Sequence, residues 1–477
     1  MRGRIRRLVG ESLIRNSAFL STNVAIGAVT GLGTLSLLTR LYSVRAVGLS
    51  AAALSATGLI TTISQLGLNY SLVRFLPQSR HRADLINSVL TATLLVALVG
   101  GSIFLVLPTA AKLYALGGVG FAVAFLISTG VTAGNAQLGT VFVADRAVGD
   151  TVWPNMVGGL ARLAAPAALL FMGIAGAYVA QGVVPAGVDC LILAVMLARR
   201  GHRFRPKLSK TATRDLRRFS VGTYIASLIG GLPLIALPLV ILSRFGPSQN
   251  AYWYTGIAGA SLLFAIPGSV SQALLAEAAH QPAQRRALVR KASIMIVSVM
   301  APVLLIAYFA APFGLALLGH HYAAEGLATL RLLIVAAAMS SVNYITGTIL
   351  YLAKKTFAIA AINTVDAIIV LGLATTWAHG AHGVAVAWVA GEVANIILFG
   401  LLAAIALYQV HGRWEALGGD QPATATSLAG LAYATKESQQ AGLDLLISLS
   451  SLGLTGPIYG PGQLPSDRRK RRSRPQP

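Results

Sequence analysis

Long apolar runs separated by short polar gaps dominate the chain. An α-helix rises about 1.5 Å per residue, so about 20 apolar residues cross a hydrocarbon core of about 30 Å. Runs that meet this length lie near 18–39, 47–73, 85–107, 119–141, 153–173, 177–198, 219–242, 251–275, 292–318, 326–351, 357–377 and 381–408. The pattern predicts an all-α integral membrane protein with about twelve transmembrane helices.

Composition excludes a soluble globular protein. Charged residues make up 11% of the chain and hydrophobic residues 55%, with a mean hydropathy of +0.70, whereas soluble domains carry about 25% charged residues. The single cysteine, Cys190, lies in an apolar run, so neither a disulfide within the chain nor a cysteine metal cluster can form. We expect no metal site and no cofactor.

The net charge of +23 suggests nucleic-acid binding at first, but its placement indicates membrane orientation. With the N-terminus in the cytoplasm, 24 basic residues fall in the N-terminal segment and the inside gaps, while four fall outside: Arg40, Arg45, Lys112 and Arg244. By the positive-inside rule, both termini are cytoplasmic and nucleic acid is not a partner. Tyr252, Trp253 and Tyr254 follow the Arg244 loop and predict an aromatic anchor at the outer interface.

The two halves of the chain match when the first is shifted by 204 residues. All six spans then fall on the second six, with Arg40 on Arg244 and Gly27 on Gly231. An even number of spans per half predicts parallel repeats, as in two-lobed transporters. We expect an N-terminal six-helix lobe at 1–205 and a C-terminal one at 206–410. Alternatively, the match arises by chance, because any two six-helix blocks of similar length superpose in hydropathy.

The remaining residues, 411–477, differ in kind. They are rich in small residues and end in a basic cluster at 468–474. We expect a largely disordered cytoplasmic tail whose basic end either attracts anionic lipid or is solvated without a role.

Four charged residues stand out inside predicted spans, where charge is expensive and marks a functional hypothesis. Arg162 and Asp189 fall at equal depth on consecutive antiparallel helices, which predicts an ion pair; alternatively, Arg162 lines the cavity and contacts an anionic substrate. The shift of 204 residues maps Arg162 onto Asp366 and Asp189 next to Glu392. Asp366, Glu392 and Asp189 are therefore candidates for proton coupling, and structural hydrogen bonding of a protonated acid is the alternative.

Arg40 and Arg244 occupy equivalent repeat positions among the few outside basic residues. Guanidinium groups clamp phosphate with two hydrogen bonds, so the pair could hold a pyrophosphate at the lobe interface. The alternative is snorkelling at the outer interface.

A stretch near the N-terminus resembles a known family. The segments are Asn16-Ser17, 37–43 (LLTRLYS), Val47-Gly48, 66–69 (LGLN) and 73–77 (VRFLP), and they are similar to polysaccharide-biosynthesis flippases. That family belongs to the superfamily of multidrug, oligosaccharidyl-lipid and polysaccharide exporters. The resemblance implies a V-shaped two-lobed transporter that moves a polyprenyl-pyrophosphate-linked glycan to the outer leaflet. The substrate-binding candidates are Arg40, Arg244, Arg162, Asn16, Asn23, Gln65, Asn69 and Arg74.

Two other classes compete with a flippase. A cation-coupled multidrug antiporter is disfavoured because neither 18–39 nor 219–242 contains the acid typical of that branch. A polyprenyl-dependent glycosyltransferase or polymerase is disfavoured because Glu325 is the one acid in any predicted outer loop. We therefore expect a monomeric, non-enzymatic flippase in a bacterial inner membrane. Its partners would be the lipid-linked glycan, membrane lipids and glycan-synthesis enzymes.

Overall fold

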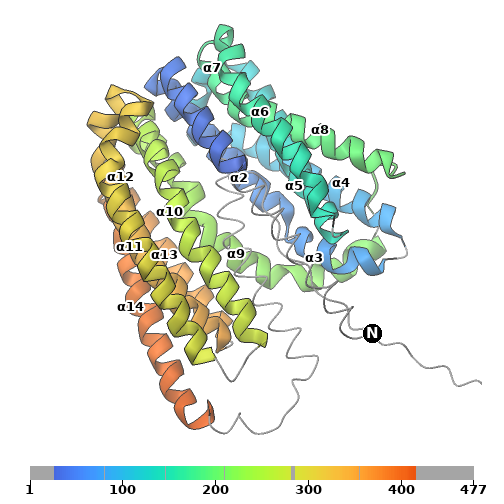
Figure 1. Cartoon of the computed structure of the whole chain (residues 1–477). Helices are drawn as coiled ribbons and strands as arrows, with labels where there is room; N and C mark the ends of the chain where they lie inside the picture. The colour runs from blue at the N-terminus through green and yellow to red at the C-terminus, as the bar shows by residue number, and fades with distance from the viewer. Residues whose placement is uncertain are drawn as a thin grey trace, which may run out of the picture.

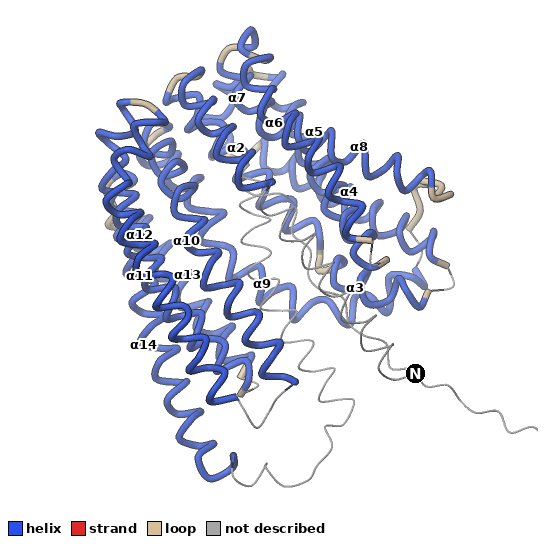
Figure 2. The backbone as a smooth tube through the Cα atoms, in the orientation of Figure 1, coloured by secondary structure: helices blue, strands red, loops and turns tan. Residues whose placement is uncertain are grey.

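The computed structural model describes residues 26–79, 81–145, 147–208, 210–280, 285–353 and 355–414. Asn16, Asn23 and the tail from 415 onward lie outside these ranges. Within them, every regular element is helical, as Figure 2 shows. The first described helix covers 26–41.

The following elements fall into two groups. The first group comprises α2 (Val44–Gln65), α3 (Leu68–Phe75), α4 (Arg82–Leu105), α5 (Val119–Ala144), α6 (Val152–Ala168), α7 (Ile174–Tyr178) and α8 (Val184–Arg199). The second comprises α9 (Lys210–Phe245), α10 (Pro247–His280), α11 (Arg285–Leu318), α12 (His320–Leu352), α13 (Thr356–Thr376) and α14 (Gly380–Trp414). A π-helical turn at Val179–Val183 joins α7 to α8.

Ten helices in the described ranges are long and apolar enough to cross a membrane. They coincide with ten of the twelve predicted runs, with α7, the π-turn and α8 together forming one span, Ile174–Arg199. The first run is described from Ile26 onward, and α6 has 17 residues. Helix α14 continues to Trp414, so the first four residues assigned to a disordered tail, 411–414, are helical.

The predicted span 47–73 is wrong at its end. Helix α2 stops at Gln65 because Leu66 and Gly67 adopt left-handed backbone angles, with φ of 49° and 68°. Left-handed φ interrupts an α-helix, and glycine tolerates it without a Cβ clash. Helix α3 then begins at Leu68.

The two groups of helices form two bundles that meet along α2, α9 and α10, as Figure 1 shows. Helix α2 is central. In its most apolar stretch of 18 residues, 83% of the residues are buried, against 17% in the corresponding stretch of α11. Its small side chains at 51–53 and 56 are alanines with no exposed surface, which lets neighbouring helices approach closely. Helix α11 lies at the periphery and exposes apolar side chains such as Leu305, Phe309 and Phe313, as a lipid-facing helix does.

The predicted aromatic anchor at the outer membrane interface is wrong. Trp253 and Tyr254 are completely or almost completely buried, and Tyr252 is 9% exposed. Trp253 packs beside Trp388 with ring centroids 6.0 Å apart. These rings therefore fill the interior because α10 is covered by α2 and α12, and they do not mark the membrane surface.

Candidate functional site

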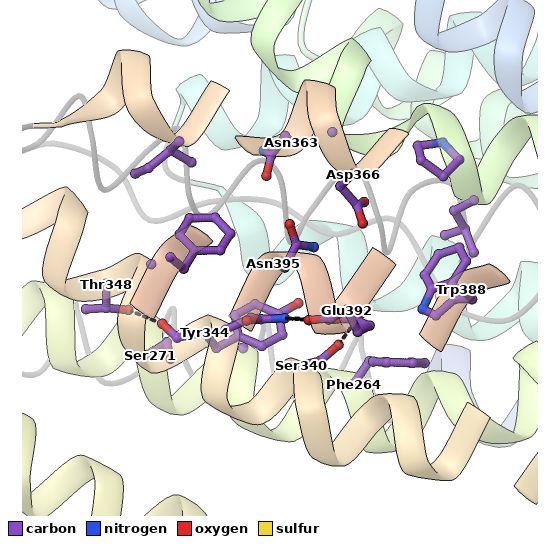
Figure 3. A pocket seen from close by; sticks show the side chains of 18 of the residues that line it. Phe264, Ser271, Ser340, Tyr344, Thr348, Asn363, Asp366, Trp388, Glu392 and Asn395 are labelled. Carbon is purple, nitrogen blue, oxygen red and sulfur yellow. Dashed lines mark hydrogen bonds between the residues drawn. The ribbon is translucent and has the colours of Figure 1, made fainter. Parts of the chain in front are cut away.

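A cavity with several polar side chains on its wall lies within the second bundle (Figure 3). Its volume is about 230 Å³, and helices α9, α10, α12, α13 and α14 contribute to its wall. Three polar pairs line it: Ser340 and Asn343, Asn363 and Asp366, and Glu392 and Asn395. Each pair is spaced by three residues on one helix, which places both side chains on the same helix face. Three consecutive helices thus turn polar groups toward one space.

Glu392 is held by two side chains of α12. The Ser340 hydroxyl donates a hydrogen bond to Oε1 of Glu392. The Asn343 amide donates to Oε2 at 2.6 Å and also to the Glu392 backbone carbonyl at 3.3 Å. Both carboxyl oxygens therefore have donors, which fixes the carboxyl group relative to α12.

Asp366 approaches α14 from α13. Asn395 faces its carboxyl group at hydrogen-bond range, and the charge of Asp366 acts on Glu392. A Cβ atom at Gly391 would lie 2.5 Å from Oδ1 of Asp366, so the absence of a side chain there makes room for the carboxyl group. The two acids share one enclosure, as the shift of 204 residues had suggested for acids in the second half.

The contents of this cavity indicate what it can bind. Carboxylate, amide and hydroxyl oxygens are the ligands of hard cations, and a carboxylate also accepts a proton. Typical small-molecule sites enclose about 300–1,000 Å³, so this space suits a proton, a small cation or water. A lipid-linked glycan needs a larger compartment.

Arg162 and Asp189 are both buried in the first bundle, 8% and 5% exposed. The charge of Asp189 acts on Arg162, and the ion pair between them stays a prediction. A Cβ atom at Gly158 would lie 1.8 Å from Oδ1 of Asp189. Asp189 on α8 therefore sits against α6 one turn before Arg162, and Gly158 makes that approach possible.

The same pair lies close to the contact between the bundles. Tyr254 of α10 interacts electrostatically with Arg162, and its hydroxyl donates to the Gln181 side chain at 2.9 Å. The Gln181 amide donates in turn to Ser50 of α2 at 3.1 Å. This chain of contacts ties α10 to the first bundle beside a buried charge.

Helices α2 and α10 touch directly near their first residues. The Asn250 amide donates to the Gly48 carbonyl at 2.7 Å. A Cβ atom at Gly48 would lie 1.7 Å from the Pro247 carbonyl oxygen. This contact is at the end of the bundles where Arg40 and Arg244 lie, opposite the end that carries Arg82, Arg200 and Arg290.

Arg40 and Arg244 both bind helix ends. The Arg40 Nε donates to the Leu317 carbonyl at 2.9 Å, near the last residue of α11. Arg244 donates to the carbonyls of Ala374 and Thr375, at the end of α13. A cation at a helix C-terminus satisfies free carbonyls and opposes the helix dipole. Arg40 thereby links the two bundles, whereas Arg244 acts within the second.

The structure says less about the other candidate substrate-binding residues, which come from the N-terminal stretch. Gln65 and Asn69 are buried at the end of α2 and the start of α3. Arg74 lies on α3, whose backbone is described, and its side chain is outside the description. Asn16 and Asn23 precede the described residues. Their roles, like those of Arg40 and Arg244, stay predictions.

Sequence reasoning missed several residues of the cavity. Ser340, Asn343, Asn363 and Asn395 are uncharged, so a search for ionisable groups passes over them. Their spacing of three residues from one another or from Asp366 and Glu392 was the available signal.

Arg331 was missed too. It lies inside α12, and its guanidinium is 4.8 Å from the Tyr308 ring centroid, which is a cation–π contact.

The family follows from a match over more than half of the chain. Residues 13–276 match the family described as polysaccharide biosynthesis protein. The chain belongs to this family. Among proteins of curated function, none matches it in sequence.

Solved structures show the fold of this member of the polysaccharide biosynthesis family. A multidrug-resistance MATE transporter of the MOP superfamily, in its inward-facing conformation, has a TM-score of 0.55 at 16% identity, covering 84% of this chain and 95% of that one. An outward-facing structure with the same description gives 0.53 at 17%, covering 85% and 96%. A MOP-superfamily transporter from Pyrococcus furiosus Vc1, described as having a binding pocket of reverse polarity, gives 0.53 at 14%, covering 86% and 96%.

This chain is therefore a multi-pass membrane protein of the polysaccharide biosynthesis family, and its fold is similar to that of solved MOP-superfamily transporters. The apolar helices in the described ranges account for its membrane location.

Proposed function

We propose that this transporter is a flippase for a polyprenyl-(pyro)phosphate-linked oligosaccharide or another cell-envelope polysaccharide precursor. The family match over residues 13–276 carries the proposal. Precursors of such polymers are built on lipid carriers whose charged headgroups cannot cross hydrocarbon unaided. A transporter that serves this pathway moves the headgroup from the inner to the outer leaflet while the lipid tail stays in the bilayer.

The proposed setting is the inner membrane of a bacterium, with both termini in the cytoplasm. The excess of basic residues at one end of the bundles supports that orientation. We place the N-terminal lobe at 1–205, the C-terminal lobe at 206–410 and a basic tail at 411–477. The chain acts as a monomer, alongside the enzymes that synthesise the glycan.

Transport proceeds by alternating access between the lobes. The contact of Gly48 with Pro247 and Asn250 closes the end of α2 and α10 that faces outward in this orientation. Opening outward requires this contact and the Tyr254–Gln181–Ser50 chain to separate. The same contacts re-form when the transporter reopens to the cytoplasm.

Cargo and coupling occupy different places in this proposal. The cargo phosphates bind between the lobes, where Arg40, Arg244 and Arg162 are the candidate contacts. Asp366 and Glu392 bind a coupling proton or small cation in the cavity of the second bundle, which is too small for the cargo. Asp189 is the matching acid of the first bundle.

Cation-coupled drug export is the second candidate, since structures of similar fold are described as multidrug transporters. The two functions separate in cells. Loss of the chain from its host should cause lipid-linked glycan to accumulate in the inner leaflet and reduce the surface polymer. Unchanged surface polymer, together with drug resistance on overexpression in a sensitive host, would favour the antiporter and reject the flippase.

A further inference from the structure

The segment between α8 and α9 folds back onto α4 as an ordered strap, defined here as residues 200–208. The His202 ring Nε2 lies 3.0 Å from Oδ1 of Asn87, and the Asn87 amide donates to the Arg203 carbonyl at 3.0 Å. Farther along, the Lys207 backbone N–H donates to the Thr91 hydroxyl at 3.2 Å. The strap is thus fixed along the first turns of α4.

An apolar groove begins where the strap crosses α4. Its volume is about 510 Å³, and almost all of its lining surface is apolar. The walls include Leu90, Leu94 and Leu98 of α4, Gly130 and Gly134 of α5, and Cys190 of α8. The three leucines span about 12 Å along α4 at 1.5 Å per residue. The groove therefore runs from the strap toward the middle of the bilayer, on a surface where Leu98 and Ile127 are exposed.

Phe204 connects the strap to the groove. Its ring lines the groove and packs edge-on against His202, with centroids 4.8 Å apart. Arg203 and Arg205 flank it, and both are exposed. In the described part of the chain, Arg200 pairs with Asp150 and Lys207 with Asp84, whereas neither Arg203 nor Arg205 forms an ion pair.

We propose that the strap and the groove together bind an anionic glycerophospholipid of the surrounding membrane. Arg203 and Arg205 bind the headgroup phosphate, because guanidinium groups pair with phosphate oxygens in a fork geometry. One acyl chain lies in the groove among the leucines. The site has positive charge at the basic end of the bundles, where a lipid headgroup lies. Its apolar surface extends toward the middle of the bilayer, where an acyl chain lies. This site is separate from cargo binding and does not depend on the proposed flippase activity.

Native mass spectrometry of the purified full chain, titrated with phosphatidylglycerol or phosphatidylcholine, tests the site. We expect tighter binding of phosphatidylglycerol and a loss of that preference in the R203Q/R205Q variant. A basic residue near an anionic surface contributes about 1 kcal/mol, or about fivefold, so the double variant should bind about 25-fold more weakly. The matched control is R290Q/K291Q, which removes two exposed charges at the same end of the second bundle.

A second variant tests the groove without changing charge. The space beside Gly130 is open, since a Cβ there would have Leu98 at 3.8 Å as its nearest neighbour. Gly130→Leu fills the groove and should reduce phosphatidylglycerol binding while thermal unfolding in phosphatidylcholine stays unchanged. Alkylation of Cys190, the single cysteine, should be slowed by added phosphatidylglycerol in the wild type and not in R203Q/R205Q.

The outcomes separate the alternatives. Equal binding of the two lipids, or equal loss in R203Q/R205Q and R290Q/K291Q, would overturn the site as diffuse surface attraction. Binding of polyprenyl phosphate that depends on Arg203 and Arg205, with indifference to phosphatidylglycerol, would also overturn it and assign the groove to the cargo.

Discussion

Individual half-buried carboxyl groups in the second bundle are positioned by uncharged neighbours. Glu392 accepts hydrogen bonds from Ser340 and Asn343, and Asp366 fits into space left by Gly391. A carboxyl group held in this way can still accept a proton. Arg40 and Arg244 are different, because both already bind helix carbonyls.

Neutralising the cavity acids should impair transport more than folding. In Glu392→Gln and Asp366→Asn the side chains keep their size, so we expect flipping in proteoliposomes to fall at least about tenfold while the unfolding temperature changes little. The matched control is Glu325→Gln, an exposed acid at the other end of α12. Flipping at the wild-type rate in both cavity variants would remove these acids from coupling.

Arg40→Ala combined with Arg244→Ala should reduce flipping without loss of expression. Each substitution also frees carbonyls at a helix end, so we expect a stability cost of about 0.3–1 kcal/mol per site. Expression and thermal unfolding measure the structural effect, and a reconstituted flipping assay measures the functional one. Unchanged flipping would limit the two arginines to helix capping.

His202 gives the strap a pH dependence. Burial lowers the pKa of the His202 imidazole below its ordinary value of 6.5. Its contribution to stability is therefore complete above that value and is lost as the pH falls through the folded-state pKa. Thermal unfolding of wild type and His202→Gln should differ more at pH 7.5 than at pH 5.5. An equal difference at both pH values would contradict this role.

At the scale of whole elements, helix ends and helix contacts depend on backbone details that hydropathy does not report. The run 47–73 looked continuous, yet left-handed angles at Leu66 and Gly67 end α2. Tyr252–Trp253–Tyr254 looked interfacial, yet α10 is enclosed on that face. Runs of apolar residues predicted where helices lie, and they could not predict which helix neighbours which.

The contact between α2 and α10 should be sensitive to one methyl group. Gly48→Ala places a Cβ 1.7 Å from the Pro247 carbonyl oxygen, so the helices must separate. Overpacking of this kind costs about 1–3 kcal/mol, which favours conformations in which this contact is open. Gly187→Ala on α8 is the control, since nothing lies within 4 Å of a Cβ there.

Spin labels can measure that separation. With Arg45→Cys and Ser248→Cys in a Cys190→Ser background, the distance between labels on α2 and α10 should shift to longer values in Gly48→Ala and stay unchanged in Gly187→Ala. An unchanged distribution in Gly48→Ala would show that the contact is not a barrier to opening.

At the scale of the whole molecule, the sequence predicted a membrane protein and its family, because both depend on short stretches of neighbouring residues. Apolar runs of about 20 residues predicted the helices, and the segments near 16–77 predicted the family that the match over 13–276 shows. The cavity was predictable in part: Asp366 and Glu392 stand out as charges in apolar runs. Its amides, the strap on α4 and the Gly48–Pro247 contact arise from packing between distant segments, which a single sequence does not encode in any local pattern.

The most direct measurement is flipping of a fluorescent polyprenyl-pyrophosphate-linked oligosaccharide by the purified chain in proteoliposomes, read by quenching with a membrane-impermeant reagent. Protein-dependent exposure of the inner-leaflet pool, slowed by unlabelled lipid-linked glycan and not by cationic drugs, is the predicted result. Protein-free vesicles serve as the inactive reference. No exposure of that lipid by the folded wild-type chain, together with uptake of a cationic drug in the same vesicles, would contradict the account.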